Sequence, residues 1–297
     1  MSAATAAGGA VSRGLRGGAR VRGLLALAPF LLFCAAFLVV PLLLMLVQSV
    51  RGPGGDLTLS HFGRAFAAEY RGALLNSLVI SVVSAAAGTA IGGIAAWAAL
   101  HARSGFVRRG VVTLANVTSN FAGIPLAFAF IATLGTSGFV TAWLDRLVGL
   151  DLCSWGRFFY KAPGVTLAYV YFQLPLMILV ITPALRGLRT EWAEAAASLG
   201  ASRGEYFRRV ALPVLAPSLL ASFMLLCANA LGAYATAFAL AQDNVNLLPI
   251  KIGFLMTGDV TLDQGLASAL AVVLVVLMAL LIAGYQAMAA RGRRWLA

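Results

Sequence analysis

The residue types that could do chemistry gather in one stretch of this chain, EWAEAAASLGASRGEYFRRVALPVLAPS, residues 191–218. Glutamates, arginines, glycines and prolines stand close together there, between two long segments that carry no charge. Such carboxylates can cap helices or pair with cations on a partner, but the stretch places no nucleophile beside a base. It is therefore expected to serve structure and contacts, and not catalysis.

Cysteine and histidine are too sparse for a catalytic or metal site. The three cysteines, Cys34, Cys153 and Cys227, have no spacing typical of a metal site or a disulfide framework. The two histidines, His61 and His101, fall in different connections between apolar segments. There is also no phosphate-cradling GxxxxGK[ST] loop. We expect no catalytic residue, no metal and no cofactor on this chain. If the function of the protein consumes ATP, a different protein chain must bind it.

The composition is that of a membrane protein. The 297 residues are 61% hydrophobic and 11% charged, with a mean hydropathy of +0.91, outside the habits of soluble globular domains. Crossing the hydrocarbon core takes roughly 20 apolar residues in a helix. Each of the long charge-free windows can hold one such helix: residues 23–50, 72–102, 110–144, 162–185, 210–242 and 264–290. We predict an all-α membrane protein with six transmembrane helices.

The first window is a membrane anchor and not a cleaved leader. Arginines precede it, as in a secretion signal, but a signal core has about 7 to 15 residues and residues 23–50 form a much longer apolar run. No small-residue cleavage pattern follows. Residues 1–22 are then a basic tail and residues 23–50 the first transmembrane helix.

The distribution of arginine and lysine predicts the topology. Most of the 22 basic residues fall in the tail, in the second and fourth connections and in the C-terminal segment, residues 291–297. The positive-inside bias therefore places the N-terminus and the C-terminus in the cytoplasm. We attribute the net charge of +12 to topology and to contact with anionic membrane lipids, and expect no nucleic acid as a partner.

The fourth connection, residues 186–213, predicts two short helices. Thr190 can cap the first helix, and an apolar stripe at helical spacing then follows: Trp192, Ala195, Ala196 and Leu199. Gly200 stands where helices commonly end in a left-handed residue.

The second short helix begins with a capping box, Ser202 with Glu205 three residues on. Pro213 disfavours a helical Leu212, and Pro217 can open the fifth span. Such an insert could lie on the bilayer surface, pack on its own protein or fit a partner's groove.

These residues also carry a resemblance to a known family. The insert resembles the EAA motif, EAA-x3-G-x9-I-x-LP, of permease subunits in binding-protein-dependent type I ABC importers, with a conservative valine at the isoleucine position. The matching residues are Glu194, Ala195, Ala196, Gly200, Val210, Leu212 and Pro213. The similarity extends over about residues 72–285, within a permease core of five transmembrane helices at residues 72–290.

The resemblance implies a fold, partners and a location. In that family the EAA segment is a coupling helix that docks on a separate ATPase, which binds ATP and Mg. We accordingly expect the type I ABC importer permease fold, in the bacterial cytoplasmic (inner) membrane. The expected partners are an ATPase dimer, a second permease that is more often a different chain than a copy, an extracytoplasmic solute-binding protein and membrane lipids.

Polar residues in the spans suggest where a solute would pass. No charge lies at the predicted mid-depth of any span, which argues against an ion-coupled carrier. One group of polar residues lies in the third window: Asn116, Ser119 and Asn120. A second group lies in the fifth window: Asn229, Tyr234 and Thr236. They can line a translocation pathway, or they can be hydrogen-bonding contacts between helices. Gly123 and Pro125 predict a kink or break in the third span.

The substrate is less constrained. The stretch LGAYAT, residues 231–236, resembles the branch of these permeases that serves polyamines, iron complexes and phosphonates. Members of that branch often carry an acid in this stretch and this chain does not, which lowers polyamines relative to anionic or zwitterionic solutes. The main alternative to an importer permease is a self-sufficient carrier or channel whose insert lies on the membrane. A membrane enzyme is a further alternative, which the lack of catalytic residues disfavours.

Overall fold

The computed structural model describes residues 27–52, 54–102, 104–148, 160–241, 244–257 and 263–296. Within these ranges the chain is mainly helical, and the described residues contain no β-strand, only an isolated β-bridge between Arg51 and Leu57. The helical segments long and apolar enough to cross a membrane are Leu27–Val50, Ala68–Leu100, Ile124–Leu147, Ala162–Arg186, Arg203–Leu231 and Gln264–Gly292. The prediction of an all-α membrane protein with six transmembrane helices is confirmed. The predicted tail, residues 1–22, and Cys153 lie outside the described residues.

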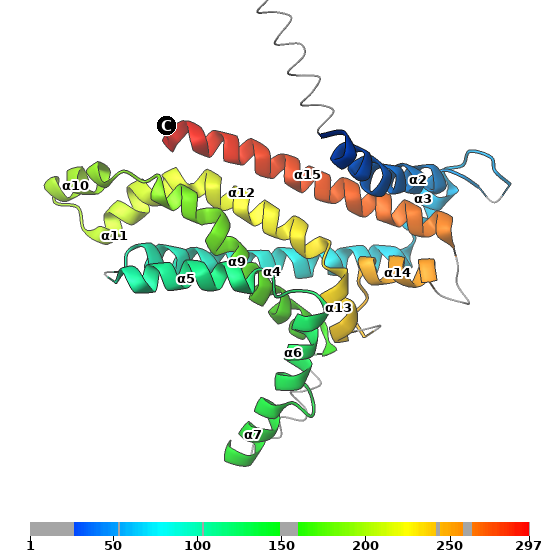
Figure 1. The fold of residues 1–297 in the computed structure, drawn as a ribbon, viewed down its shortest axis with the longest axis horizontal. Helices are drawn as coiled ribbons and strands as arrows, with labels where there is room; N and C mark the ends of the chain where they lie inside the picture. The colour runs from blue at the N-terminus through cyan, green and yellow to red at the C-terminus, as the bar shows by residue number, and fades with distance from the viewer. Residues whose placement is uncertain are drawn as a thin grey trace, which may run out of the picture.

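The described residues form the following helices in chain order. Their bounds are η1 Ala35–Val39, α2 Val40–Ser49, α3 Ser60–Ala65, α4 Ala68–Leu100, α5 Gly105–Thr118, α6 Ile124–Leu134, α7 Phe139–Val148, α9 Ala162–Arg186, α10 Thr190–Ser198, α11 Arg203–Tyr206, η3 Phe207–Ala211, α12 Leu212–Leu231, α13 Tyr234–Ala241, α14 Leu248–Thr257 and α15 Gln264–Leu296. Helices α10 and α11 lie at one end of the long bundle, and the α2–α3 connection lies at the other (Figure 1). The C-terminal end of α15 lies at the same end as α10 (Figure 1).

The centre of the bundle is formed by α4, α9, α12 and α15, which pack side by side. Small residues allow α4 to approach α9 closely, as is common between helices in membranes. A Cβ atom added at Gly92 would lie 2.7 Å from the Cβ atom of Met177, so only glycine fits at this crossing. The buried amide of Gln173 on α9 donates a hydrogen bond of 3.0 Å to the hydroxyl of Ser84 on α4. Packing and one buried polar contact thus fix the two helices against each other.

The first span stands apart from this centre. None of its most apolar window is buried inside the structure. Its C-terminal half, α2, packs on α15, where the hydroxyl of Ser268 lies 3.3 Å from the side-chain oxygen of Gln48. Aliphatic side chains such as Leu32 and Leu38 are 69% and 66% exposed, which suits contact with lipid or with another membrane protein.

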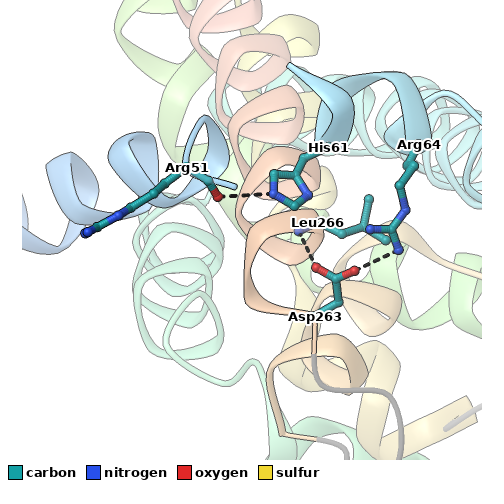
Figure 2. A network of polar contacts seen from close by, with 5 residues as sticks. All are labelled: Arg51, His61, Arg64, Asp263 and Leu266. Atoms are coloured by element: carbon teal, nitrogen blue, oxygen red, sulfur yellow. Dashed lines mark hydrogen bonds and ion pairs between the residues drawn. The ribbon is translucent and has the colours of Figure 1, made fainter. Parts of the chain in front are cut away.

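A polar cluster ties the first span, α3 and α15 together at the end away from α10; we term it the clasp. Figure 2 shows its members, Arg51, His61, Arg64, Asp263 and Leu266. His61 is 6% exposed and its Nε2 donates to the carbonyl oxygen of Arg51 at 3.2 Å. Asp263 caps α15 by accepting from the backbone N–H of Leu266 at 2.9 Å and pairs with Arg64 at 2.7 Å.

Burial raises the pKa of the Asp263 carboxyl, but the hydrogen bonds from Leu266 and Arg64 outweigh burial and hold this pKa below its usual value. The carboxylate is therefore ionised at neutral pH and keeps both of its bonds.

Two of the windows predicted to cross the membrane are broken. The third window, residues 110–144, leaves the helical path between Thr118 and Ile124, so the predicted kink or break near Gly123 is confirmed, and the span Ile124–Leu147 begins after this break. Helices α6 and α7 then turn away from α5 and project from the side of the bundle (Figure 1). The fifth is interrupted at Gly232 and Ala233, between α12 and α13. Breaks inside membrane spans leave backbone groups free to face a cavity.

Candidate functional site

Helix α10 carries the first part of the EAA-like motif away from the bundle. It begins at Thr190, and Arg189 precedes it in extended backbone without a side-chain cap, so the prediction that Thr190 caps the helix is wrong by one position. Glu194 and Ala195 are exposed and Ala196 is half-buried. None of the residues of α10 is buried. The helix therefore leaves the carboxylate of Glu194 and the side chain of Ala195 uncovered by the rest of this chain.

Gly200 ends α10 in the left-handed conformation that the sequence predicts. Its φ is +78°, and the N–H of Ala201 reaches back to the carbonyl oxygen of Ala196 at 3.0 Å, the closing bond of a Schellman motif. A Cβ atom added at Gly200 would meet nothing within 4 Å. Glycine is therefore required here by the backbone conformation and not by space.

The capping box that opens α11 is present as predicted. The carboxylate of Glu205 accepts from the backbone N–H of Ser202 at 2.9 Å, and the hydroxyl of Ser202 accepts from the N–H of Glu205 at 3.3 Å. Gly200 and this box together set the corner between α10 and α11.

The second part of the motif differs from expectation. Pro213 does not end the helix at Leu212, whose φ of −63° and ψ of −46° are helical. A π-helical turn, η3, runs through Val210 and leads directly into α12, with Pro213 in its first turn. Proline is tolerated there because the wider turn spares the hydrogen bond that its missing N–H would have made. Pro217 lies inside α12 and does not open it, so α11 and the fifth span form one continuous helical path.

The two breaks in the spans meet side by side. The hydroxyl of Thr236 on α13 donates to the carbonyl oxygen of Gly123 at 3.4 Å, and Gly123 has a φ of +72°. The hydroxyl of Tyr169 on α9 donates to the carbonyl oxygen of Ala233 at 2.7 Å. Both broken segments are thus held by side chains far away in the sequence.

A hollow of about 480 Å³ opens between these breaks. Four of the six candidate pathway residues line it: Ser119, Asn229, Tyr234 and Thr236. The other lining residues are small or apolar, among them Phe172 and Gly232, and no charged side chain is included. Its size is typical of sites for small molecules.

Asn116 and Asn120 are not among the residues that line this hollow. Asn116 donates to the carbonyl oxygen of Val112 at 2.9 Å, and Asn120 donates to that of Asn116 at 2.8 Å. Both amides are exposed and finish the C-terminal turns of α5. The sequence analysis grouped Asn116 and Asn120 with Ser119, close to the break at Gly123. Of these three residues, Ser119 alone lines the hollow.

Sequence reasoning missed Tyr169, which is 3% exposed. Its partner, the carbonyl oxygen of Ala233, lies 64 positions away, so no local pattern pointed to the contact.

Among the described residues, no group of three or more His, Cys, Asp or Glu is placed to hold a metal ion. Cys34 and Cys227 are free thiols.

Comparisons with known proteins agree with this architecture. Residues 88–294 match the family described as binding-protein-dependent transport system inner membrane component. A Salmonella typhi protein named as a 2-aminoethylphosphonate transport system permease, PhnU, is 28% identical over 238 residues, which cover 78% of this chain and 80% of that protein. The sulfate transport system permease protein CysT of Escherichia coli K12 is 26% identical over 276 residues, 91% of this chain and 94% of its own.

Solved structures share the fold. A chain of a bacterial alginate ABC transporter, crystallised with a periplasmic protein bound to an alginate pentasaccharide, superposes with a TM-score of 0.75 at 16% identity, covering 94% of this chain and 96% of its own. A chain of the inward-facing MetNI methionine ABC transporter gives a TM-score of 0.54 at 20% identity, over 74% of this chain and 94% of its own.

Proposed function

Because the chain belongs to the family of binding-protein-dependent transport system inner membrane components, and is a multi-pass permease subunit of an ABC importer, we propose that α10 couples it to a separate ATPase. The observation that carries the proposal is the placement of Glu194, Ala195 and Ala196 on a helix with no buried residue, at the end of the bundle. The alanines allow close backbone approach, and Glu194 can pair with a cation of the partner.

The continuous path from α11 through η3 into α12 suits this role. A displacement of α10 by the ATPase is transmitted by the corner at Gly200 into the helix that ends at the break beside Ala233. The hollow lined by Asn229, Tyr234 and Thr236 lies at that same break. In this proposal ATP-driven closure of the ATPase changes access to the hollow, which is the solute pathway.

The substrate proposed is a small oxyanion or zwitterion of the phosphonate type. The hollow has no carboxylate that would attract a polycation, and the first turn of α13, Tyr234 to Thr236, contributes to its lining. The N-terminal turn of a helix favours negative charge. Two relatives are named for 2-aminoethylphosphonate and for sulfate, both of which carry oxyanion groups.

The proposed assembly contains more than this chain. It pairs with a second permease, more often a different chain than a copy, with two copies of the ATPase and with an extracytoplasmic solute-binding protein. ATP and Mg are bound by the ATPase and not by this chain. The orientation proposed is the one that the arginine distribution predicts, with both termini and α10 on the cytoplasmic face of the bacterial inner membrane.

The test of this function is copurification from native membranes, with the wild-type chain beside Glu194→Lys. The expected result is that an ATPase and a second permease accompany the wild type and that the ATPase is lost from the variant. If the chain is isolated alone in both cases, under conditions that preserve a known ABC importer, the self-sufficient carrier becomes the better description. Uptake of labelled 2-aminoethylphosphonate, sulfate and spermidine by cells with and without the chain then tests the substrate, and uptake of spermidine alone would contradict an oxyanion.

A further inference from the structure

An apolar groove of about 570 Å³ runs between α4, α9 and α12, away from the solute pathway. Its floor and walls include Ala86, Ala90 and Ile94 of α4 with Leu220 and Phe223 of α12. Apart from Thr89 and Trp97, every lining residue is glycine, an aliphatic residue or phenylalanine. The hydroxyl oxygen of Thr89 is itself buried, so the groove offers almost nothing to a polar ligand. Its dimensions and chemistry suit a hydrocarbon chain.

The groove lies along Leu212 to Phe223 of α12, and the hollow lies at its C-terminal end, at Asn229 and Gly232. Leu220 of the groove and Asn229 of the hollow point to opposite faces of α12, since nine residues correspond to about two and a half turns of an α-helix. Around the groove, Ile94 is 70% exposed and Leu220 is 51% exposed. In the proposed assembly the second permease faces the hollow, which leaves the exposed side chains of the groove to face the bilayer.

Aromatic residues mark the end of the groove that is nearest α10 and α11. The rings of Trp97 and Phe207 lie edge to face with centroids 5.0 Å apart, and Trp97 also stacks on His101 at 4.2 Å. Tryptophan is enriched where hydrocarbon meets the headgroup region. The groove therefore runs from the membrane interior to the interface.

A second, polar hollow of about 660 Å³ follows directly in the chain, lined by Ser202, Gly204, Glu205, Arg208 and Arg209. Both arginines are exposed, and neither has an ion-pair partner among the described residues. The carboxylate of Glu205 is occupied by its hydrogen bonds to Ser202. The hollow therefore holds two guanidinium groups against one carboxylate, an excess of positive charge, and guanidinium groups bind phosphate well.

We propose that the groove and the arginine hollow together form a binding site for an anionic phospholipid. One acyl chain lies along Ala86, Ala90 and Ile94, and the phosphate lies against Arg208 and Arg209. The inference goes beyond the proposed transport function and rests on two parts of it. The orientation places this end of the bundle in the cytoplasmic leaflet, where anionic lipids attract arginine, and the second permease at the hollow leaves the groove facing the bilayer. The lipid stabilises the helical path from α11 through η3 into α12, since it contacts both Phe207 and Leu220.

The test compares lipids retained by the purified full chain after release from nanodiscs of equal phosphatidylglycerol and phosphatidylethanolamine, by native mass spectrometry. The wild type is expected to retain phosphatidylglycerol preferentially. Ala90→Phe fills the groove and abolishes retention. Ala98→Phe changes another exposed alanine of α4, outside the groove, and leaves retention unchanged. Arg208→Gln and Arg209→Gln keep a lipid bound but each lowers the preference for phosphatidylglycerol about fivefold.

Quenching of tryptophan fluorescence by phosphatidylglycerol with brominated acyl chains reports the same site directly. The part of the quenching that disappears in Trp97→Phe belongs to the groove, and it should disappear in Ala90→Phe as well. Equal lipid retention by Ala90→Phe and wild type overturns the proposal. So does quenching of Trp97 that is present in the isolated chain and absent in the complex with the second permease, because the groove is then a protein interface. Normal elution and unfolding temperatures of the variants confirm that they are folded.

Discussion

The hydroxyl of Tyr169 lies 2.7 Å from the carbonyl oxygen of Ala233 and donates to it across the interface between α9 and the break of the fifth span. A carbonyl freed by a helix break inside a membrane has lost its donor within the helix, and leaving it unpaired is costly. Tyr169 supplies that donor and so fixes the position at which α13 begins. This contact and the bond between Thr236 and Gly123 hold two of the segments that line the hollow.

Removal of the tyrosine hydroxyl should loosen the break. Tyr169→Phe leaves the carbonyl of Ala233 without its donor, at an expected cost of about 1–3 kcal/mol in stability. The midpoint of thermal unfolding in detergent should fall, and uptake should fall with it. Tyr171→Phe is the matched control, since Tyr171 is 36% exposed on the same helix. Equal midpoints for the two variants would show that the hydrogen bond contributes nothing.

The corner after α10 should depend on backbone conformation alone. Gly200→Leu forces a branched side chain into a φ of +78°, at a cost of about 1–2 kcal/mol. Gly200→Asn tolerates the left-handed region and finds open space. We expect membrane insertion of both variants, loss of uptake and of ATPase copurification in Gly200→Leu, and retention of both in Gly200→Asn. Loss in both variants would point instead to a contact with the glycine itself.

The polar residues of the spans should fall into two classes. Asn229→Ala and Thr236→Val remove groups that line the hollow and should reduce uptake about twofold to tenfold, the value of one hydrogen bond. Asn116→Ala removes an exposed amide that bonds only within α5 and should leave uptake near the wild-type rate. Uptake rates are to be normalised to the amount of chain in the membrane. The reverse ranking would place the pathway along α5.

The clasp should show a defined pH dependence. The pKa of Asp263 is below its usual value, so the ion pair with Arg64 contributes above the unfolded pKa, near 4, and is lost as the pH falls through the folded pKa. Asp263→Asn keeps the cap on Leu266 and loses the pair, for a cost of at most about 1 kcal/mol because Arg64 is 56% exposed. Asp263→Ala loses both interactions and costs about 1 kcal/mol more.

Thermal unfolding of the purified chain between pH 3 and pH 8 measures this dependence. The difference between wild type and Asp263→Asn should be constant above about pH 5 and shrink below about pH 4. If the difference between wild type and Asp263→Asn stayed unchanged down to pH 3, protonation of the Asp263 carboxylate would not remove the contribution of its ion pair with Arg64.

Local patterns in the sequence determined the spans and the corner of the insert. Six apolar windows predict six membrane helices because each helix satisfies its own backbone hydrogen bonds within a few residues. The left-handed Gly200 and the capping box of Ser202 and Glu205 depend on neighbours at most three to five positions away, which the sequence displays. The role of Glu194, Ala195 and Ala196 in coupling stays a prediction.

Only the tertiary structure decided how the broken spans meet and which polar residues line a hollow. The helix continues through Pro213, directly after the π-helical turn η3, although the local preference of a residue before proline predicted a break at Leu212. Tyr169 reaches Ala233 over 64 positions, and Thr236 reaches Gly123 over 113. Contacts of such separation arise from packing in three dimensions, where burial makes an unpaired carbonyl costly, and a linear pattern of residue types does not encode which distant donor will satisfy it.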